Sequence, residues 1–420
     1  MNKPLFLAGT ARGGTNLIRW ILDVHPEINL ESEPFMPLYR SLRNAIVSKS
    51  RNPLIKSFNP DAPIDEYYYF DNKLAVMELI QKSKLDVKFD SERLDPLKQA
   101  ITNRMNDYCP LLVPYLNEFY GETYKDLFDA GLDIISMGQN NKDATWRGWL
   151  DNWIVEFFTP LAREYLDAHF IFIFRDVRSS IASSNKAFMF DGESYDKYES
   201  KIISANVNPN VNTKHENSLK APLTLSFLRS WRKQIAFVEY LQGLKIFKNR
   251  LHIIRYESIV ENPKIEVNKI CDFLGVEYLP RMLDTTNFRS LGKNHKINNS
   301  AFKNSNKGIY KDSLSRWKSE LSNKLIRFIE YVVGPDLKYL GYELSRSNGF
   351  QIQDWDWYEL YEKEYLKCKG WRTDNGSPEV DLGLEMLRHQ LLQFETNDQE
   401  LIRRCFLFPE IYDRLLGKHR

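Results

Sequence analysis

Hydrophobic residues in this chain gather in short continuous runs, separated by longer stretches with helical spacing. The continuous runs predict buried strands at 4–9 and at 169–176, the second of which reads HFIFIFRD. We expect further strands around 28–30 and within RLHIIRYES at 250–258, the latter also buried. Because helical patterns follow these strands, the sequence predicts an α/β fold with a doubly wound parallel sheet flanked by helices.

Two long segments depart from this alternation. Residues 36–140 show no period-two pattern and are rich in Tyr, Asp, Lys and Pro, so we expect a mainly helical insertion there. From about residue 346 the pattern changes to separate amphipathic helices, QDWDWYELYEKEYL and LGLEMLRHQLLQF. We therefore expect one main domain over 1–345 and a helical C-terminal extension over 346–420.

Composition and charge limit which ligands, cross-links and cellular locations we expect. The 420 residues carry 58 Lys and Arg against 56 Asp and Glu, a formal net charge of +2, which excludes a global basic field for nucleic acid. The four cysteines are far apart and form no C-x-x-C pair, so we expect neither a zinc site nor a disulfide framework. We see no signal peptide and no apolar run near the ~20 residues of a membrane span, and expect a cytoplasmic protein.

The stretch LFLAGTARGGTNLIRWIL reads as a strand, a glycine-rich turn and a helix. Backbone N–H groups around Gly13 and Gly14 and the start of a helix would favour an anion, with Arg12, Thr15 and Asn16 adding a charge and donors. The turn resembles a phosphate-binding P-loop but lacks its lysine, because no G-K-[ST] follows Gly9. The alternative interpretation is a tight turn without a ligand.

Three further groups of residues are candidates for the same site. Arg175 ends a buried strand, and Ser183 lies eight residues later, in the following helix. They can converge on a second phosphate, since ligands gather at the carboxyl ends of parallel strands; an ion pair and a surface serine are the alternative. Lys307 and Gly308 belong to a basic loop that is either a phosphate lid or a solvated surface.

The third group is the pair Glu31 and Glu33, which follows a strand in NLESEPF. A carboxylate near a phosphate turn can take a proton from a hydroxyl, although paired exposed carboxylates are more often only solvated. The strand should return this pair to the rim that holds the glycine turn, which makes it a candidate for catalysis.

Taken together and in this order, the motifs resemble the sulfotransferases that use 3'-phosphoadenosine-5'-phosphosulfate (PAPS). TARGGTNL is similar to that family's loop for the 5'-phosphosulfate, and the strand-end Arg175 with Ser183 is similar to its 3'-phosphate site. IIRYESIVENP resembles a later element of the family and implies that Tyr256 contacts the nucleotide. The late lysine-bearing segment is matched at Lys307 and Gly308.

RGGTNLIRWILDVHPEINLESE is most similar to the tyrosylprotein and carbohydrate branches of that family. The resemblance implies that Glu33 is the catalytic base, with Glu31 as its near rival, and that the NKD element supplies a catalytic lysine at Lys142. It further implies PAPS as donor without a metal, and in-line transfer in which Arg12 stabilises the developing charge. The absence of a P-loop lysine agrees with a donor that has no β- or γ-phosphate.

The acceptor is left open by the sequence. A carbohydrate or glycolipid hydroxyl is the acceptor that the resemblance favours, with the 36–140 insertion on the acceptor side; a small molecule or a protein tyrosine is the alternative. Aromatic side chains could stack on sugars, but such clusters more often serve packing (Tyr67, Tyr68, Tyr69, Phe70, Trp146, Trp149 and Trp153). Two other classes stay open: a kinase with a degenerate P-loop, and a non-catalytic glycan-binding protein on the same fold.

Overall fold

A computed structural model of the chain describes residues 2–55, 58, 60, 71–190, 220–288, 309, 311–345 and 378–418. The chain divides into two compact units. The first comprises Met1–Ile55, Ala75–Arg175 and Phe237–Leu314, and the second comprises Lys56–Leu74, Asp176–Ala236 and Ser315–Arg420.

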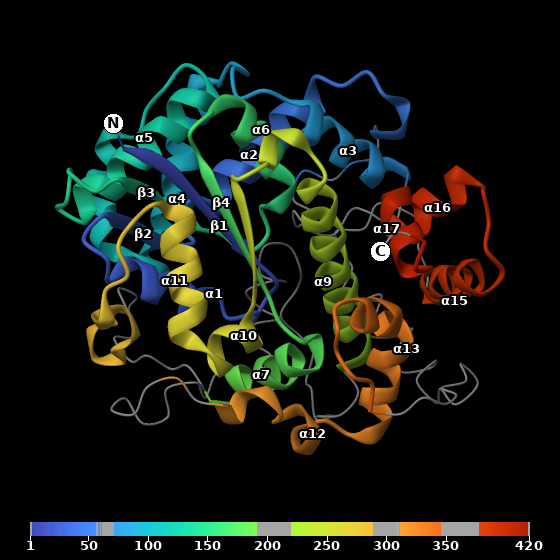
Figure 1. The fold of residues 1–420 in the computed structure, drawn as a ribbon. Helices are drawn as coiled ribbons and strands as arrows, with labels where there is room; N and C mark the ends of the chain where they lie inside the picture. The colour runs from blue at the N-terminus through green and yellow to red at the C-terminus, as the bar shows by residue number, and fades with distance from the viewer. Residues whose placement is uncertain are drawn as a thin grey trace. The chain divides into compact units, whose positions relative to one another are not determined.

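The first unit is built on a five-stranded sheet with the order β2-β3-β1-β4-β5, in which every neighbouring pair is parallel. The bounds are β1 Lys3–Gly9, β2 Ile28–Ser32, β3 Trp146–Leu150, β4 His169–Phe174 and β5 Leu251–Arg255 (Figure 1). The chain adds β2 and β3 on one side of β1 and then β4 and β5 on the other. The doubly wound parallel sheet is thereby confirmed, and ligands in such sheets bind at the carboxyl ends where the strand order reverses.

The alternation of side chains along β1 explains the two layers of helices. Leu5 and Leu7 are fully buried in a hydrophobic cluster with α1 (Thr15–Asp23), α10 (Tyr256–Glu261) and α11 (Pro263–Leu274). Phe6 points to the opposite face, where its ring meets Trp149 edge-on at 5.3 Å. The Trp149 indole N–H donates to the Tyr39 hydroxyl at 3.1 Å, and both side chains are fully buried.

Strand β3 was missed by the sequence analysis. Its sequence WRGWL contains an arginine and a glycine, and such a segment lacks the continuous apolar run by which the other strands were identified. Gly148 is required because a Cβ there would lie 1.7 Å from the Leu5 carbonyl oxygen of β1. Strand β5 was predicted too long and too buried: it is an edge strand, mostly half-buried, and helix α10 begins at Tyr256.

The chain between β2 and β3 is helical in its regular elements, apart from an isolated bridge between Lys88 and Thr123. Thr123 and Asp126 form a reciprocal capping box that starts α5. The elements are α2 Met36–Ser48, η1 Pro53–Ile55, α3 Asp71–Lys82, η2 Ser91–Arg93, α4 Leu94–Tyr108, η3 Pro110–Glu118 and α5 Tyr124–Gly138. Shorter elements of the rest of the first unit are η4 Val155–Phe157, α6 Phe158–Glu164, η5 Lys245–Phe247, η6 Pro280–Leu283, η7 Thr285–Asn287 and η9 Lys311–Leu314.

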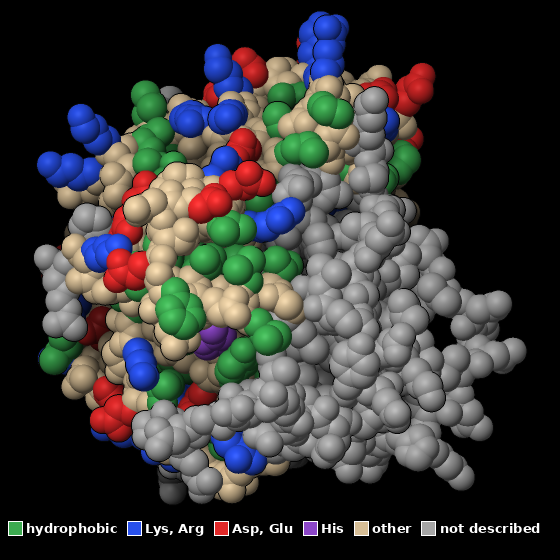
Figure 2. Space-filling view, turned by 90° about the vertical axis from the view of Figure 1, so that its right-hand side faces the viewer, with side chains coloured by type: hydrophobic (Ala, Val, Ile, Leu, Met, Phe, Trp, Pro, Cys, Tyr) green, Lys and Arg blue, Asp and Glu red, His purple; other side chains and the backbone are tan. Residues whose placement is uncertain are grey.

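The surface carries charges of both signs. Figure 2 shows Lys and Arg side chains interspersed with Asp and Glu over the described part of one face. Such mixing agrees with the formal net charge of +2. Among the described residues, no helix is long and apolar enough to cross a membrane.

The second unit consists of helices in the part of the chain that the structure describes. Their bounds are α7 Val177–Phe190, the larger part of α9 Lys220–Gln242, α12 Trp317–Glu320, α13 Asn323–Tyr339, α15 Pro378–Phe394, α16 Gln399–Phe406 and α17 Pro409–Leu415. The segment LGLEMLRHQLLQF lies in α15, whereas QDWDWYELYEKEYL and residues Tyr67–Phe70 lie outside the described residues.

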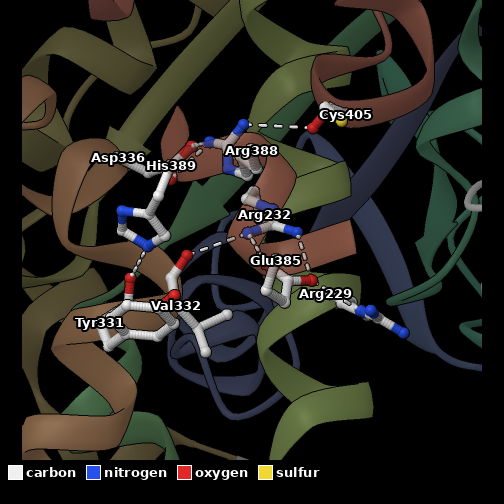
Figure 3. Close-up of polar contacts among 9 residues, drawn as sticks. All are labelled: Arg229, Arg232, Tyr331, Val332, Asp336, Glu385, Arg388, His389 and Cys405. Carbon is white, nitrogen blue, oxygen red and sulfur yellow. Dashed lines mark hydrogen bonds and ion pairs between the residues drawn. The ribbon is translucent and has the colours of Figure 1, made fainter. Parts of the chain in front are cut away.

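Buried ion pairs fasten α15 to its neighbours in the second unit (Figure 3). Glu385 of α15 accepts hydrogen bonds from Arg229 at 2.8 Å and from Arg232 at 2.9 and 3.0 Å, both on α9. One turn later, Arg388 donates to both carboxylate oxygens of Asp336 on α13 at 2.8 Å. All five side chains are buried. Helix α15 is therefore bonded to α9 and α13. The predicted boundary at residue 346, between a main domain and a C-terminal extension, stays a prediction.

Candidate active site

The glycine-rich turn after β1 folds back on itself before α1 begins. The Gly13 amide donates to the Thr10 carbonyl at 2.8 Å, and α1 starts at Thr15. Arg12 has a φ of 56°, a left-handed conformation that is uncommon for a residue with a side chain and is often found at functional sites. The first amides of α1 have no partners within their own helix, so the turn presents N–H donors and the positive end of the helix dipole together.

Gly14 is a position where a side chain would not fit and the backbone conformation favours glycine. Its φ is 96°, and a Cβ there would lie 2.2 Å from Cδ2 of Tyr256. The ring of Tyr256, the first residue of α10 after β5, therefore packs directly against the turn. The close approach links the ends of β1 and β5.

Tyr256 also links the turn to Arg175, the residue after β4. The Arg175 guanidinium lies over the Tyr256 ring, 4.4 Å from its centroid, and donates to the Ser313 carbonyl oxygen. The Tyr256 and Ser313 hydroxyls are hydrogen-bonded at 3.1 Å. The structure thus brings the glycine turn, Arg175 and Tyr256 to one rim, the carboxyl edge of the sheet.

Glu33 reaches the same rim from β2. It follows the last residue of that strand and has a φ of 51°, and its amide donates to the Leu150 carbonyl oxygen at 2.7 Å. The preceding Ser32 hydroxyl donates to the Asn16 side-chain oxygen in the first turn of α1 at 3.4 Å. Arg12 interacts electrostatically with Glu33. The predicted base and the phosphate turn are therefore neighbours.

Both carboxylate oxygens of Glu33 are held. Arg104 of α4 donates to one of them through Nη2, and Asn152 donates to the other at 2.6 Å. Arg104 also donates from Nε to the Glu33 backbone carbonyl at 2.7 Å. Burial raises the pKa of Glu33, and Arg104 and then Arg12 lower it, with a net increase. A carboxylate that is oriented by donors and more basic than usual suits a general base.

Glu31 lies in a different environment, inside the first unit. Its side chain is 1 % exposed and accepts a hydrogen bond from Gln139, the residue after α5. Burial, and secondly the nearby Asp23, raise the pKa of Glu31 to about 8, while Arg19 lowers it. Glu31 and Glu33 are thus placed differently, and Glu33 is the one beside the turn.

Of the remaining predicted residues, Lys142 is not brought to this rim. Lys142 is exposed and precedes β3, so it lies at the amino edge of the sheet, where its carbonyl oxygen accepts from Asn2. A five-residue strand rises roughly 16 Å, which separates that edge from Glu33. Ser183 is buried in α7 of the second unit, and its pairing with Arg175 stays a prediction. Lys307 and Gly308 lie outside the described residues.

Comparison with known proteins identifies the family. A model of the sulfotransferase family matches residues 4–280, well over half of the chain. The chain belongs to the sulfotransferase family. None of the curated proteins matches it.

Solved structures of sulfotransferases are similar to the chain at low sequence identity. The sulfotransferase domain of the Synechococcus PCC 7002 olefin synthase is 15 % identical, with a TM-score of 0.40, over 78 % of this chain and 94 % of that one. The sulfotransferase domain of the curacin biosynthetic pathway is 16 % identical, with a TM-score of 0.42, over 82 % and 99 %. Sulfotransferase STF9 from Mycobacterium avium is 12 % identical, with a TM-score of 0.38, over 82 % and 79 %. Membership of the family rests on the match to residues 4–280.

Four residues at the rim of this sulfotransferase were missed by the sequence analysis: Arg104, Asp151, Asn152 and Ser313. Asp151 and Asn152 directly follow β3, so they would have been found had that strand been recognised. Arg104 comes from a helix of the insertion and Ser313 from η9, and their side chains have no local signal that marks them as site residues.

The aromatic residues considered for sugar stacking divide in two. Trp146 and Trp149 of this sulfotransferase are 1 % and 0 % exposed and pack in the core, so the packing interpretation is correct for them. Trp153 is half-buried. Among the described residues, no group of His, Cys, Asp and Glu is arranged to hold a metal ion.

Proposed function

We propose that this sulfotransferase moves the sulfuryl group of PAPS to a hydroxyl of an acceptor, releasing adenosine 3',5'-bisphosphate (PAP). The observation that carries the proposal is the convergence of the glycine turn, Arg175, Tyr256 and Glu33 at one edge of the sheet. Such a rim offers anion-binding groups on either side of β1 and a basic carboxylate next to one of them.

In this proposal the two ends of the nucleotide are held by different strands. The amides of the turn and Arg12 bind the 5'-phosphosulfate at the start of α1. Arg175, after β4, binds the 3'-phosphate, together with Ser183, Lys307 and Gly308, which the resemblance assigns to the nucleotide. Tyr256 packs between the turn and Arg175 and keeps both in place.

The reaction itself needs one bond to form as another breaks. The acceptor oxygen attacks sulfur in line with the bond to the 5'-phosphate, and Glu33 accepts the hydroxyl proton. The sulfur–oxygen bond to the phosphate then breaks, and negative charge grows on that phosphate. Arg12 and the turn amides stabilise this charge where it develops. The products are a sulfate ester and PAP, with the proton on Glu33. Because Lys142 lies at the opposite edge, it has no part in this mechanism.

For the acceptor, we propose a carbohydrate or glycolipid hydroxyl, on the strength of the resemblance to the carbohydrate branch. The test is mass spectrometry for the gain of one sulfate across a panel of glycans, glycolipids, small phenols and tyrosine peptides supplied with PAPS. Sulfation of phenols or peptides alone would overturn the acceptor class and leave the sulfuryl transfer standing.

Glu33→Gln tests the base. We expect turnover to fall by about 10²- to 10⁴-fold while PAP still binds, because only the proton acceptor is lost. Glu118→Gln, an exposed position in η3, serves as the matched control and should retain turnover. Near-normal turnover of Glu33→Gln would remove Glu33 from this role.

Arg175 tests the donor. Arg175→Ala should weaken PAP binding by roughly 10- to 100-fold in calorimetry, since a charge-assisted contact to phosphate is lost. Arg175→Lys, which keeps the charge, should retain part of the affinity, and Arg93→Ala, at an exposed arginine, should retain all of it. PAP without metal should also raise the melting temperature more than ATP with Mg²⁺. The reverse order would favour a kinase.

A further inference from the structure

Two acidic side chains at the ends of neighbouring strands share one arginine. Glu33 follows β2, Asp151 follows β3, and Arg104 reaches both from α4. The Arg104 Nη2 atom forms an ion pair with Glu33 and lies 3.9 Å from Oδ1 of Asp151. One guanidinium group is therefore shared by two carboxyl groups.

The two carboxyl groups differ in the hydrogen bonds that they accept. Glu33 accepts hydrogen bonds from Arg104 and Asn152. Asp151 is 0 % exposed, and within the described residues neither of its carboxyl oxygens has a hydrogen-bond partner of good geometry; the Phe35 amide approaches only closely enough for a weak interaction. An ionised carboxylate that is buried without donors is strongly disfavoured, whereas its protonated form is tolerated. The proton of the pair therefore belongs on Asp151.

The charged groups around the two acids also favour the proton on Asp151 over Glu33. Burial, followed by the nearby Glu33, raises the pKa of Asp151 well above its usual value, against Arg104 and a weak effect of the Phe35 amide. Arg104 and Arg12 face Glu33, and both lower its pKa. The other titratable groups near Asp151, Tyr39 and Cys109, have pKa values raised by burial, so they add no charge at neutral pH.

We infer that Asp151 holds a proton at neutral pH, and that Arg104 thereby acts on Glu33 alone, as a positioning residue that keeps it ionised and oriented. The role in catalysis rests on the proposed function, with Glu33 as base. Arg104 is suited to this because it binds both the carboxylate and the backbone carbonyl of Glu33, which has a left-handed φ of 51°. Lysine at position 104 would keep the charge but not this double contact.

Infrared difference spectroscopy tests the protonation states without any acceptor. A Glu31→Gln background removes a second buried carboxyl whose pKa is raised to about 8. In that background at pH 7, Asp151→Asn should remove the absorption of a protonated carboxyl. Loss of carboxylate bands instead would overturn the inference. If Asp151→Asn does not fold, a pH titration of the Glu31→Gln protein replaces it. The absorption of a protonated carboxyl must then persist up to pH 7, and its loss below pH 7 would overturn the inference.

The same method tests Arg104. At pH 7 and with Arg104 present, Glu33→Gln should remove carboxylate bands, because Glu33 is ionised. In the Arg104→Gln background, Glu33→Gln should instead remove the band of a protonated carboxyl. Identical difference spectra in the two backgrounds would show that Arg104 does not control Glu33. Neither result depends on turnover, so the outcome is independent of the proposed function.

Activity supplies the second readout, with release of labelled sulfate from PAPS to water as the probe reaction. Arg104→Gln should move the acid limb of the pH–rate profile up by about one pH unit, so that the rate falls about tenfold at low pH and recovers at high pH. Arg104→Lys should show a smaller shift, and Arg93→Gln none. A uniform loss at all pH values would mean a merely structural role. If Glu33→Gln retains turnover, Glu33 is not the base and Arg104 has no catalytic role through it, whatever the spectra show, while sulfuryl transfer itself stands.

Discussion

Two buried carboxylate clusters, Glu385 in the second unit and Glu33 with Asp151 in the first, are paired with arginine in different ways. In the second unit, Glu385 is bonded to two arginines, Arg229 and Arg232, and they lower its pKa to about 2 against the effect of burial. In the first unit, Arg104 is shared by the carboxyl groups of Glu33 and Asp151, and Arg12 acts on Glu33 only through electrostatics. Burial then outweighs these arginines, and the pKa of both acids is raised.

Between these two clusters, the difference lies in how many arginine N–H groups donate to each carboxyl group and not in burial alone. Two arginines with good geometry offset desolvation and produce a permanent ion pair, which holds helices together. One arginine for two acids leaves a proton in the cluster and a carboxylate of raised basicity. The first arrangement suits architecture, and the second suits proton transfer at the rim.

Removing the charge of Glu385 should have the largest effect on stability. Glu385→Gln removes the carboxylate to which two buried guanidinium groups donate, and we expect a loss of about 3–5 kcal/mol in the free energy of unfolding. Urea unfolding at pH 7 measures the loss, and hydrogen exchange should place it in α9 and α15. A loss below about 1 kcal/mol would mean that the arginines find other partners.

Glu385 also fixes the acid limb of stability. Because its pKa is lowered from 4.5 to about 2, its contribution is present above pH 4.5 and is lost as the pH falls towards 2. The Glu385→Gln variant should therefore show a flatter dependence of the unfolding free energy on pH in that window.

Glu31→Gln should have a smaller effect of the opposite sign. The pKa of Glu31 is raised from 4.5 to about 8, so its contribution to stability is present below pH 4.5 and is lost as the pH rises towards 8. The slope is at most about 1.4 kcal/mol per pH unit, and the nearby Asp23 contributes part of the shift, so we expect a net gain of about 1–3 kcal/mol at pH 8. Urea unfolding of both proteins between pH 5 and 8 measures the gain; parallel curves would contradict the raised pKa.

The sequence was informative wherever a contact is local. Apolar runs located β1 and β4, and the glycine turn and Arg175 follow these strands directly, so their meeting at one rim could be predicted from the rule for parallel sheets. Contacts between distant segments could not: Arg104 lies 71 positions from Glu33. Lys142 was assigned by motif alone, and the register of β3 places it at the other edge.

An exposed ion pair should contribute least to the free energy of unfolding. Lys269 and Glu266 of α11 are 2.7 Å apart, with the lysine side chain 56 % exposed. Water already solvates such a charge, so Lys269→Gln should change the free energy of unfolding by less than about 0.5 kcal/mol at pH 7. Added salt should leave the difference between Glu385→Gln and the parent nearly unchanged, because a buried pair is poorly screened, while it removes what little Lys269 contributes. Equal salt sensitivity of the two variants would mean that solvent reaches Glu385. The difference in pKa between Glu385 and the Glu33–Asp151 pair would then be explained by exposure to solvent and not by the arginines that donate to each carboxyl group.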